Sequence, residues 1–235
     1  MTVGFRTAST GMYWAQKAMN VTANNIANLS TDGFKADSPS FADLLYTNVK
    51  EQEVAPELKV GHGSKLGKTD TIFGTSGMTE TDLPQDYALT DQRNFFAVKT
   101  SDGQTVYTRD GRFGLSQRGD GRFYLADSSG NLVLSSNGRT IPVTDSKAKQ
   151  NVGVFTFRNL DGLIKNGDSC YVSTNRSGSA VTVQNADICQ ECLESSGTDF
   201  ATEMSNVILQ ERAYDLDAKM AVMTDEVMQT VNSLR

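Results

Sequence analysis

The sequence has few of the residues from which disulfide scaffolds and catalytic sites are built. Its 235 residues include three cysteines and one histidine. An odd and small number of cysteines excludes a fold built on disulfides, so the fold depends on a conventional core. No stretch approaches the ~20 apolar residues of a membrane span, and the N-terminus lacks the apolar segment of a secretory signal. We expect no membrane insertion, and any exit from the cytoplasm leaves the N-terminus uncleaved.

Positive charge is also scarce. Lys and Arg number 22 against 28 Asp and Glu, which gives a net charge of -6. A phosphate backbone requires a clustered basic face, so we expect no nucleic-acid binding. The two ends differ in sign: residues 1–35 carry 3 - 1 = +2 and residues 198–235 carry 3 - 7 = -4. Ends of opposite charge attract each other, within one chain or between neighbouring copies.

The candidate chemical sites are weak. Cys189 and Cys192 form a CxxC pair, but a zinc site requires four ligands, and the other candidates are Cys170 and His62. We interpret the pair as small apolar side chains and keep a metal or redox site as the alternative. His62 lies between two glycines, and nothing singles out the acid and nucleophile that a catalytic histidine requires. The sequence predicts no enzyme, no metal site and no cofactor.

Apolar residues recur three and four positions apart at both ends of the chain, which is typical of helices that pack along one another. Residues 4–28 carry a light stripe, formed by Phe5, Ala8, Met12, Ala15, Met19, Thr22 and Ile26. From about residue 200 to the end, a segment without Gly or Pro predicts one long helix, capped by Thr198 or Asp199. Its stripe is formed by Leu209, Ala213, Leu216, Met220, Met223, Val227, Thr230 and Leu234.

Between these helices the sequence alternates short β-type runs with turns. The runs are residues 95–99, 106–109, 123–126, 132–134, 152–157 and 180–183. Asp-Gly, Ser-Gly and Asn-Gly steps separate them, and such dipeptides favour the positive φ of tight hairpin turns. The sequence therefore predicts an α+β protein. Its N- and C-terminal heptad helices pair as a coiled-coil-like inner domain, and a turn-rich antiparallel β domain is inserted between them.

Four segments follow from these patterns. We expect an N-terminal helix with its exit turn in 1–35, an extended linker in 36–76 and the β domain in 77–185. Residues 186–235 are expected to hold a connector and the C-terminal helix, which packs with the N-terminal helix. A heptad helix at each end requires its mate or neighbouring copies to cover its stripe. This layout is typical of a polymer subunit.

The stretch Ala23-Asn-Asn-Ile-Ala-Asn-Leu-Ser-Thr-Asp-Gly-Phe-Lys35 places Asn24, Asn25 and Asn28 near the end of the first helix, although Asn is a poor helix former. Because amides donate and accept at once, we interpret them as contacts between copies that fix the register. Gly33 is expected to supply the backbone freedom that ends the helix, and Phe34 to anchor the exiting chain.

This stretch, Tyr107-Thr-Arg-Asp-Gly-Arg-Phe113, Leu193-Glu-Ser-Ser196 and Gln210-Glu-Arg-Ala-Tyr214 together resemble, in order, the signatures of the bacterial flagellar rod and hook proteins. One departure is Asp91-Gln-Arg-Asn94, where that family usually has a glycine-containing turn. Hook proteins carry an extra outer domain, for which 235 residues leave no room. The chain therefore resembles rod subunits, and its last helix resembles the distal type.

The resemblance implies a structural subunit of the flagellar basal-body rod, outside the cytoplasmic membrane and spanning the envelope. It implies export by the flagellar type III system and helical self-assembly into a drive shaft that transmits torque from motor to hook. The implied partners are copies of the chain, other rod and hook proteins, the export apparatus and ring proteins. Two alternatives stay open: a short hook-type or proximal rod protein, and a secreted β-domain binding module dimerised by its terminal helices.

The predicted assembly interface gathers residues from both ends of the chain. It comprises Phe5, Met12, Met19, Asn24, Asn25, Ile26, Asn28, Gly33, Phe34, Leu209, Arg212, Tyr214, Leu216, Met220, Met223, Val227 and Leu234.

Overall fold

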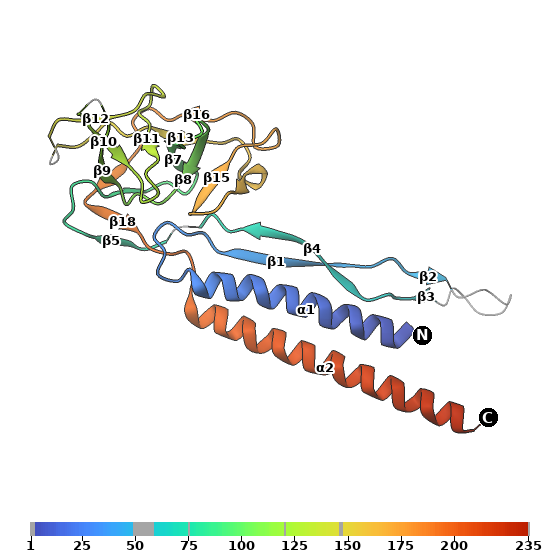
Figure 1. Cartoon of the computed structure of the whole chain (residues 1–235). Coiled ribbons are helices and arrows are strands. Elements are labelled where there is room, and N and C mark those ends of the chain that lie inside the picture. The colour runs from blue at the N-terminus through green and yellow to red at the C-terminus, as the bar shows by residue number, and fades with distance from the viewer. Residues whose placement is uncertain (1–2, 49–58, 75, 120, 146–147, 235) are drawn as a thin grey trace. The chain divides into compact units, whose positions relative to one another are not determined.

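A computed structural model of the chain describes residues 3–48, 59–74, 76–119, 121–145 and 148–234 (Figure 1). These residues form two compact units. The helical unit contains the residues up to 27, residues 37–70 and the residues from 199 onward, and the β unit contains residues 28–36 and 71–198. The chain therefore passes between the two units four times. No helix among the described residues has the length and apolar character that crossing a bilayer requires.

Two long helices dominate the helical unit. Helix α1 spans Val3–Ala27 and helix α2 spans Phe200–Ser233, so both predicted helices are confirmed. Asp199 caps α2, because its carboxylate accepts a hydrogen bond from the backbone N–H of Thr202 at 3.2 Å. The helices lie side by side and run in opposite directions (Figure 1).

A two-stranded ribbon completes the helical unit. Strand β1 (Asp37–Asp43) pairs with β4 (Ser64–Thr71), and β2 (Thr47–Asn48) pairs antiparallel with β3 (Lys59–Val60). The ribbon runs alongside α1 (Figure 1). The part of residues 36–76 that the structure describes is thus extended, and strand pairing holds it.

The β unit is built on a ten-stranded antiparallel sheet. Its strands are β7 (Asn94–Lys99), β8 (Thr105–Thr108), β9 (Gly114–Gln117), β10 (Phe123–Ala126), β11 (Leu132–Val133), β12 (Pro142–Val143), β13 (Val154–Thr156), β14 (Ile164–Lys165), β15 (Cys170–Val172) and β16 (Val181–Thr182). A short 3-10 helix, η1, spans Leu160–Gly162. All six predicted strands are confirmed within a residue or two at each end.

Two smaller strand pairs belong to the same unit. Strand β5 (Met78–Glu80) pairs with β18 (Cys192–Glu194), and β6 (Tyr87–Leu89) pairs with β17 (Ile188–Gln190). The segment expected as a connector after residue 185 therefore contributes two strands before α2 begins.

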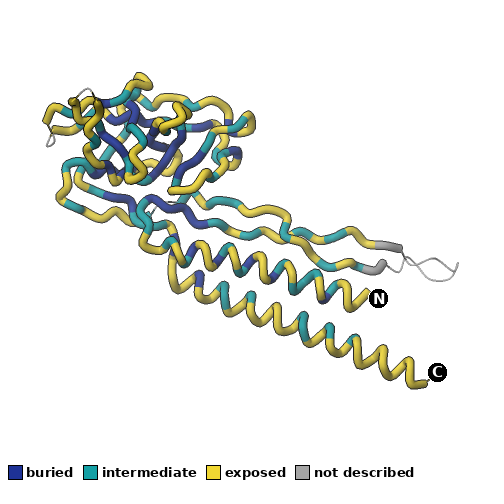
Figure 2. The backbone as a smooth tube through the Cα atoms, in the orientation of Figure 1, coloured by how far each residue is buried: buried dark blue, intermediate teal, exposed yellow. Residues whose placement is uncertain are grey.

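Strand β7 lies at the centre of the core. It pairs with β8 along one edge and with β11 and β13 along the other. Because side chains alternate across a strand, Phe96 and Val98 enter one apolar cluster while Phe95 and Ala97 enter a second on the opposite face. All four residues are fully buried. In Figure 2 the buried segments of the β unit are dark blue. Aromatic rings fill the second cluster, and the Phe95 ring lies 5.6 Å from that of Tyr171.

The turns follow the predicted chemistry in most places. Gly103, Gly121, Gly130 and Gly138 have φ between 70° and 82°, in the left-handed region that hairpin turns require. At the departure from the family pattern, the Asp91 carboxylate accepts a hydrogen bond from the backbone N–H of Arg93 at 2.9 Å. The turn is therefore formed here by an aspartate side chain that binds the backbone two residues on, in a segment without glycine.

Candidate assembly interface and a buried charge cluster

Helices α1 and α2 meet through small and polar side chains. Four polar residues of α2 that face α1 recur at heptad spacing: Glu203, Gln210, Asp217 and Thr224. Gln210 Nε2 donates a hydrogen bond to Thr22 Oγ1 of α1 at 3.0 Å. Gly11 of α1 faces Asp217, and a Cβ there would collide with its carboxylate. Small residues on α1 thus permit a close approach, and polar contacts set the register.

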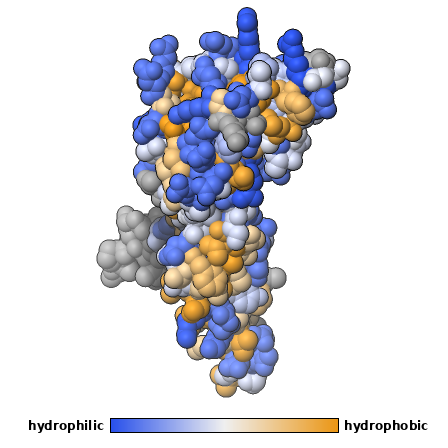
Figure 3. All heavy atoms as spheres, turned by 90° about the vertical axis from the view of Figure 1, so that its left-hand side faces the viewer, coloured by the Kyte–Doolittle hydropathy of each residue, from blue (hydrophilic) through white to orange (hydrophobic). Residues whose placement is uncertain are grey.

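The predicted apolar stripe of α2 lies on a different side of the helix. Its large members are exposed by 53% to 83%: Leu209, Leu216, Met220, Met223, Val227 and Leu234. Leu209 and Leu216 each precede a member of the polar heptad by one position, which turns them about 100° away from it. The stripe is therefore not the surface that packs on α1. Figure 2 shows α2 as mostly exposed, and Figure 3 shows apolar side chains reaching the surface.

The stripe of α1 is also rotated relative to the prediction. The buried residues of this helix are Ala8, Ala15, Ala18, Thr22 and Asn25. Met12, Met19 and Ile26 are half-buried on the flank, and Phe5 is 38% exposed. Small side chains occupy the buried positions because the neighbouring elements come close. The larger predicted residues retain surface that another chain can cover.

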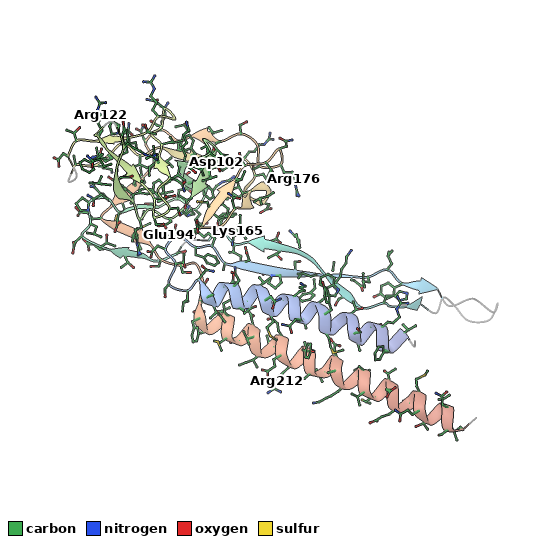
Figure 4. All side chains as sticks on the ribbon, viewed as in Figure 1. Asp102, Arg122, Lys165, Arg176, Glu194 and Arg212 are labelled. Carbon is green, nitrogen blue, oxygen red and sulfur yellow. A yellow bond between two sulfur atoms is a disulfide. The ribbon has the colours of Figure 1, made fainter. Side chains whose placement is uncertain are left out.

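Two further predicted residues of α2 are at the surface. Arg212 is exposed and points away from α1 (Figure 4). Tyr214 is 38% exposed. Both side chains are accessible to a neighbouring copy.

Asn25, which the sequence suggested as a contact between copies, is instead buried among contacts within one chain. Its side chain is 1% exposed, and its Nδ2 donates to the Asp37 carbonyl at 2.8 Å and to Glu203 Oε1 at 2.9 Å. Its Oδ1 accepts from the Asp37 backbone N–H at 3.0 Å. The amide joins α1, β1 and α2 within one chain. The sequence could not show this, because the three elements come together only in the fold.

The other two asparagines have different settings. Asn24 is exposed. Asn28 is half-buried, and its Oδ1 accepts a hydrogen bond from Thr31 Oγ1 at 3.1 Å while its carbonyl accepts one from Ser196 Oγ at 2.9 Å. Asn24 is therefore the more accessible amide of the three.

Gly33 and Phe34 lie inside the β unit, so in this fold they are not available to a neighbouring copy. Gly33 has φ of 65°, and a Cβ there would lie 2.6 Å from the Arg109 carbonyl oxygen. Phe34 is 7% exposed, and Lys165 Nζ lies 4.7 Å from the centre of its ring. Both residues, predicted for the assembly interface, are thus surrounded by residues of their own unit in the single chain.

Next to them lies a buried charge cluster formed by Lys35, Arg109 and Glu194. Lys35 Nζ lies 2.6 Å from Glu194 Oε1, and Arg109 Nε lies 2.7 Å from Glu194 Oε2. The three side chains are between 1% and 3% exposed. One buried carboxylate thus joins two cations within the β unit, and Figure 4 labels Glu194.

Backbone carbonyls and the Ser76 hydroxyl accept further hydrogen bonds from the two cations of the cluster. Lys35 Nζ donates to the Gly74 carbonyl at 2.6 Å, and Arg109 NH1 donates to the carbonyls of Asn94 at 2.7 Å and Asp91 at 2.9 Å. Burial lowers the pKa of Lys35, and its hydrogen bond with Glu194 opposes that shift. The cluster therefore joins five chain segments, those around residues 35, 74, 89–94, 109 and 194, through charge-assisted hydrogen bonds.

This cluster was not predicted from the sequence, although its three residues lie in stretches quoted above. Lys35, Arg109 and Glu194 lie in three of the four stretches that carry the resemblance to rod and hook proteins, one in each. In two of the motifs a charge directly follows a large apolar residue, in Phe34-Lys35 and Leu193-Glu194, and this was the available signal. Their meeting point depends on the pairing of β18 with β5, which no local pattern reveals.

The cysteines also differ from the interpretation as separate small side chains. The structure joins Cys189 and Cys192 in a disulfide, while Cys170 is free and buried. Burial raises the pKa of the Cys170 thiol to about 11. Within the described ranges, no three His, Cys, Asp or Glu side chains gather in a way that could hold a metal ion.

Comparisons with known proteins match both ends and the middle of the chain. Family models match for the flagella basal body rod protein over residues 5–35, the flagellar hook protein FlgE/F/G D1 domain over 91–185, and the flagellar basal body rod FlgEFG protein C-terminal over 190–234. The flagellar basal-body rod protein FlgG of Bacillus subtilis is 30% identical, with 96% of each chain covered. That of Caulobacter vibrioides is 29% identical, with 98% of each chain covered.

Proposed function

The chain belongs to the flagellar basal-body rod protein family, and from that premise we propose that its copies assemble helically through the exposed apolar stripe of α2. It is a structural subunit of the basal-body rod, of the distal type, and its place is the flagellar basal body. The proposal adds how the subunits hold together. In this proposal the helix pair of each copy becomes coiled-coil-like only when helices of neighbouring copies complete it.

The observation that carries the proposal is that α2 has two different faces, one that contacts α1 and one that is exposed and apolar. One face lies against α1 within the chain, where Glu203 and Gln210 each make a hydrogen bond with an α1 side chain. The other presents six large apolar side chains that are more than half exposed. Contiguous apolar surface of this kind in water marks an interaction site. Because the two faces are separate, α2 can bind a neighbour without releasing α1.

Charge supports the same arrangement. The last helix and its flank carry -4, and the first 35 residues carry +2. Acidic side chains of one copy can therefore meet the basic first helix of the next, which favours one orientation of stacking. Met12 and Met19, which keep partial exposure on α1, are flexible side chains suited to contacts that differ slightly between copies.

The remaining parts of the proposal follow from the family. We assign the chain no catalytic role and no cofactor, and we expect it to leave the cytoplasm through the flagellar type III export apparatus. Other rod and hook proteins are its expected neighbours along the shaft, and ring proteins are expected around it. Torque then passes through the contacts between subunits.

Two valines on α2 provide a matched test. Val227 belongs to the apolar stripe and is 62% exposed, whereas Val222 is 58% exposed on another side of the helix. Burying a valine fully stabilises a contact by about 1.5–3 kcal/mol. We therefore expect Val227→Gln to raise the critical concentration for polymerisation of the purified chain by roughly ten-fold or more, and Val222→Gln to leave it nearly unchanged.

The measurements are sedimentation of polymer as a function of protein concentration and swimming of a rod-null strain that carries each variant. Equal behaviour of the two variants would reject the stripe as the assembly surface. A purified chain that stays a defined dimer at every concentration would instead favour the alternative of a β-domain binding module.

A further inference from the structure

The disulfide between Cys189 and Cys192 spans the junction between two strand pairs. Cys189 lies in β17, which pairs with β6, and Cys192 begins β18, which pairs with β5. The Cα atoms of the two cysteines are 5.8 Å apart, a usual separation for a disulfide. Between them Glu191 has φ of 60°, in the left-handed region that is costly for a residue with a side chain. The bond therefore closes over a strained turn.

Both backbone groups of that turn are used. The Glu191 N–H donates to the Asp86 carbonyl at 2.9 Å, and its carbonyl accepts from the Thr81 N–H at 2.8 Å. Two residues after Cys192, the chain delivers Glu194 to the buried charge cluster. The disulfide thus holds a turn whose geometry sets the position of the central carboxylate of the β unit.

The surroundings of the pair indicate a structural role rather than a catalytic one. Both cysteines are partly exposed, so a reagent can reach them. Two acidic residues lie next to the pair, Glu191 between the cysteines and Glu80 opposite Cys192 across the strands. The ammonium group of Lys149 is hydrogen-bonded to the carbonyl of Ile188, which directly precedes Cys189. Reactive cysteines of oxidoreductases lie instead beside positive charge or at helix N-termini. Cys170 is buried and has a raised pKa, so it is a poor competitor in exchange.

We propose that Cys189 and Cys192 are a redox-controlled staple, which is an open dithiol in the cytoplasm and closes to a disulfide once the chain is outside. The oxidant is a small-molecule or protein disulfide, RS–SR. One cysteine thiolate attacks it and releases RSH, giving a mixed disulfide, and the second thiolate displaces the other RS group as a second RSH. The cysteine pair loses two electrons and two protons, and RS–SR is reduced. The change of compartment rests on the proposed function, whereas the chemistry does not.

The chemical part is tested on the purified full chain with glutathione as the probe. After equilibration with oxidised or reduced glutathione, free thiols are alkylated, and the labelled peptides are identified by mass spectrometry. We expect two labelled cysteines, at 189 and 192, in the reduced chain and none in the oxidised chain, with Cys170 labelled only after denaturation. Free thiols at both positions in oxidised glutathione, or a disulfide to Cys170, would overturn the proposal.

The structural part is tested by urea unfolding with and without dithiothreitol. Closing a loop this short changes the unfolding equilibrium constant by about 20-fold in the chain-entropy account. We expect reduction to lower the urea midpoint of the wild type and to leave a C189S/C192S double variant unchanged. Faster hydrogen exchange of residues 188–195 on reduction would locate the effect at this turn. A midpoint that does not respond to reduction would refute the staple.

The compartment is tested by alkylating cells at the moment of lysis. We expect free thiols in the chain of an export-blocked strain and a closed disulfide in isolated basal bodies. Reduced chain in basal bodies would overturn the compartment step. The two in-vitro tests use the monomer, so their results do not depend on whether the chain assembles. If these tests contradict the disulfide proposal, the assembly proposal is not affected.

Discussion

Replacing Glu194 by Gln removes the negative charge from the buried charge cluster while keeping nearly the same shape. Lys35 and Arg109 would then share one neutral amide in the interior of the β unit, with each of their side chains 1% exposed. The amide oxygen can accept from one cation, but the amide nitrogen would direct its own donors toward the other. Removing one partner from a buried ion pair costs about 3–5 kcal/mol, because an uncompensated charge is left behind.

This magnitude is large enough to measure directly. With a urea dependence of about 2 kcal/mol per molar, we expect the midpoint for the β unit to fall by about 1.5–2.5 M in the Glu194→Gln variant. The assay is urea unfolding followed by the near-ultraviolet signal of the aromatic cluster around Phe95. A double-mutant cycle with Lys35→Met should show a coupling energy of about 1–3 kcal/mol between the two side chains.

A surface ion pair in the same unit provides the control. Arg112 pairs with Asp32, but the arginine side chain is 62% exposed. Solvent screens such a pair, so Arg112→Ala should change the free energy of unfolding by at most about 1 kcal/mol. If Glu194→Gln destabilised the β unit no more than this control, the argument that the cluster pins the motifs together would fail.

Two further predictions concern single side chains. Asn25→Ala should destabilise the helical unit by about 1–3 kcal/mol for each buried group left unpaired, and the fluorescence of Trp14 in α1 reports its unfolding. The control is exposed Asn24→Ala, which should change the free energy of unfolding by less than about 0.5 kcal/mol. Equal effects of the two substitutions would contradict the buried role of Asn25. Burial raises the pKa of Asp110 above its ordinary 3.8, so its contribution to stability is full below pH 3.8 and is lost as the pH rises through the folded-state value. Asp110→Asn should therefore be more stable than the wild type at pH 7, and the gap in urea midpoint should shrink toward pH 3; a gap independent of pH would refute this cause.

The last helix, the hairpin turns and six of the strands could be predicted from the local sequence pattern. The absence of Gly and Pro after residue 197 and the capping residue Asp199 predicted α2 nearly to the residue, because helix ends depend on local hydrogen-bonding groups. Turn dipeptides such as Asp102-Gly103 predicted the hairpins, since their backbone preference is intrinsic. The six strands between them were recognisable from their β-branched and aromatic residues.

What the sequence determined by itself, then, is the two terminal helices, six of the strands and the apolar stripe on the last helix. Only the tertiary structure decided that this stripe stays exposed and that the polar heptad of the same helix turns toward α1. The apolar residues of α2 and the polar heptad from Glu203 to Thr224 have the same period and differ by one position, so periodicity cannot choose between them. The choice depends on α1, whose Gly11 and Thr22 present a close, polar surface that matches the heptad. The position of Glu194 between Lys35 and Arg109 also depends on the fold. Glu194 is 159 positions from Lys35 and 85 positions from Arg109 in the sequence, so the three side chains meet only after the strands have paired.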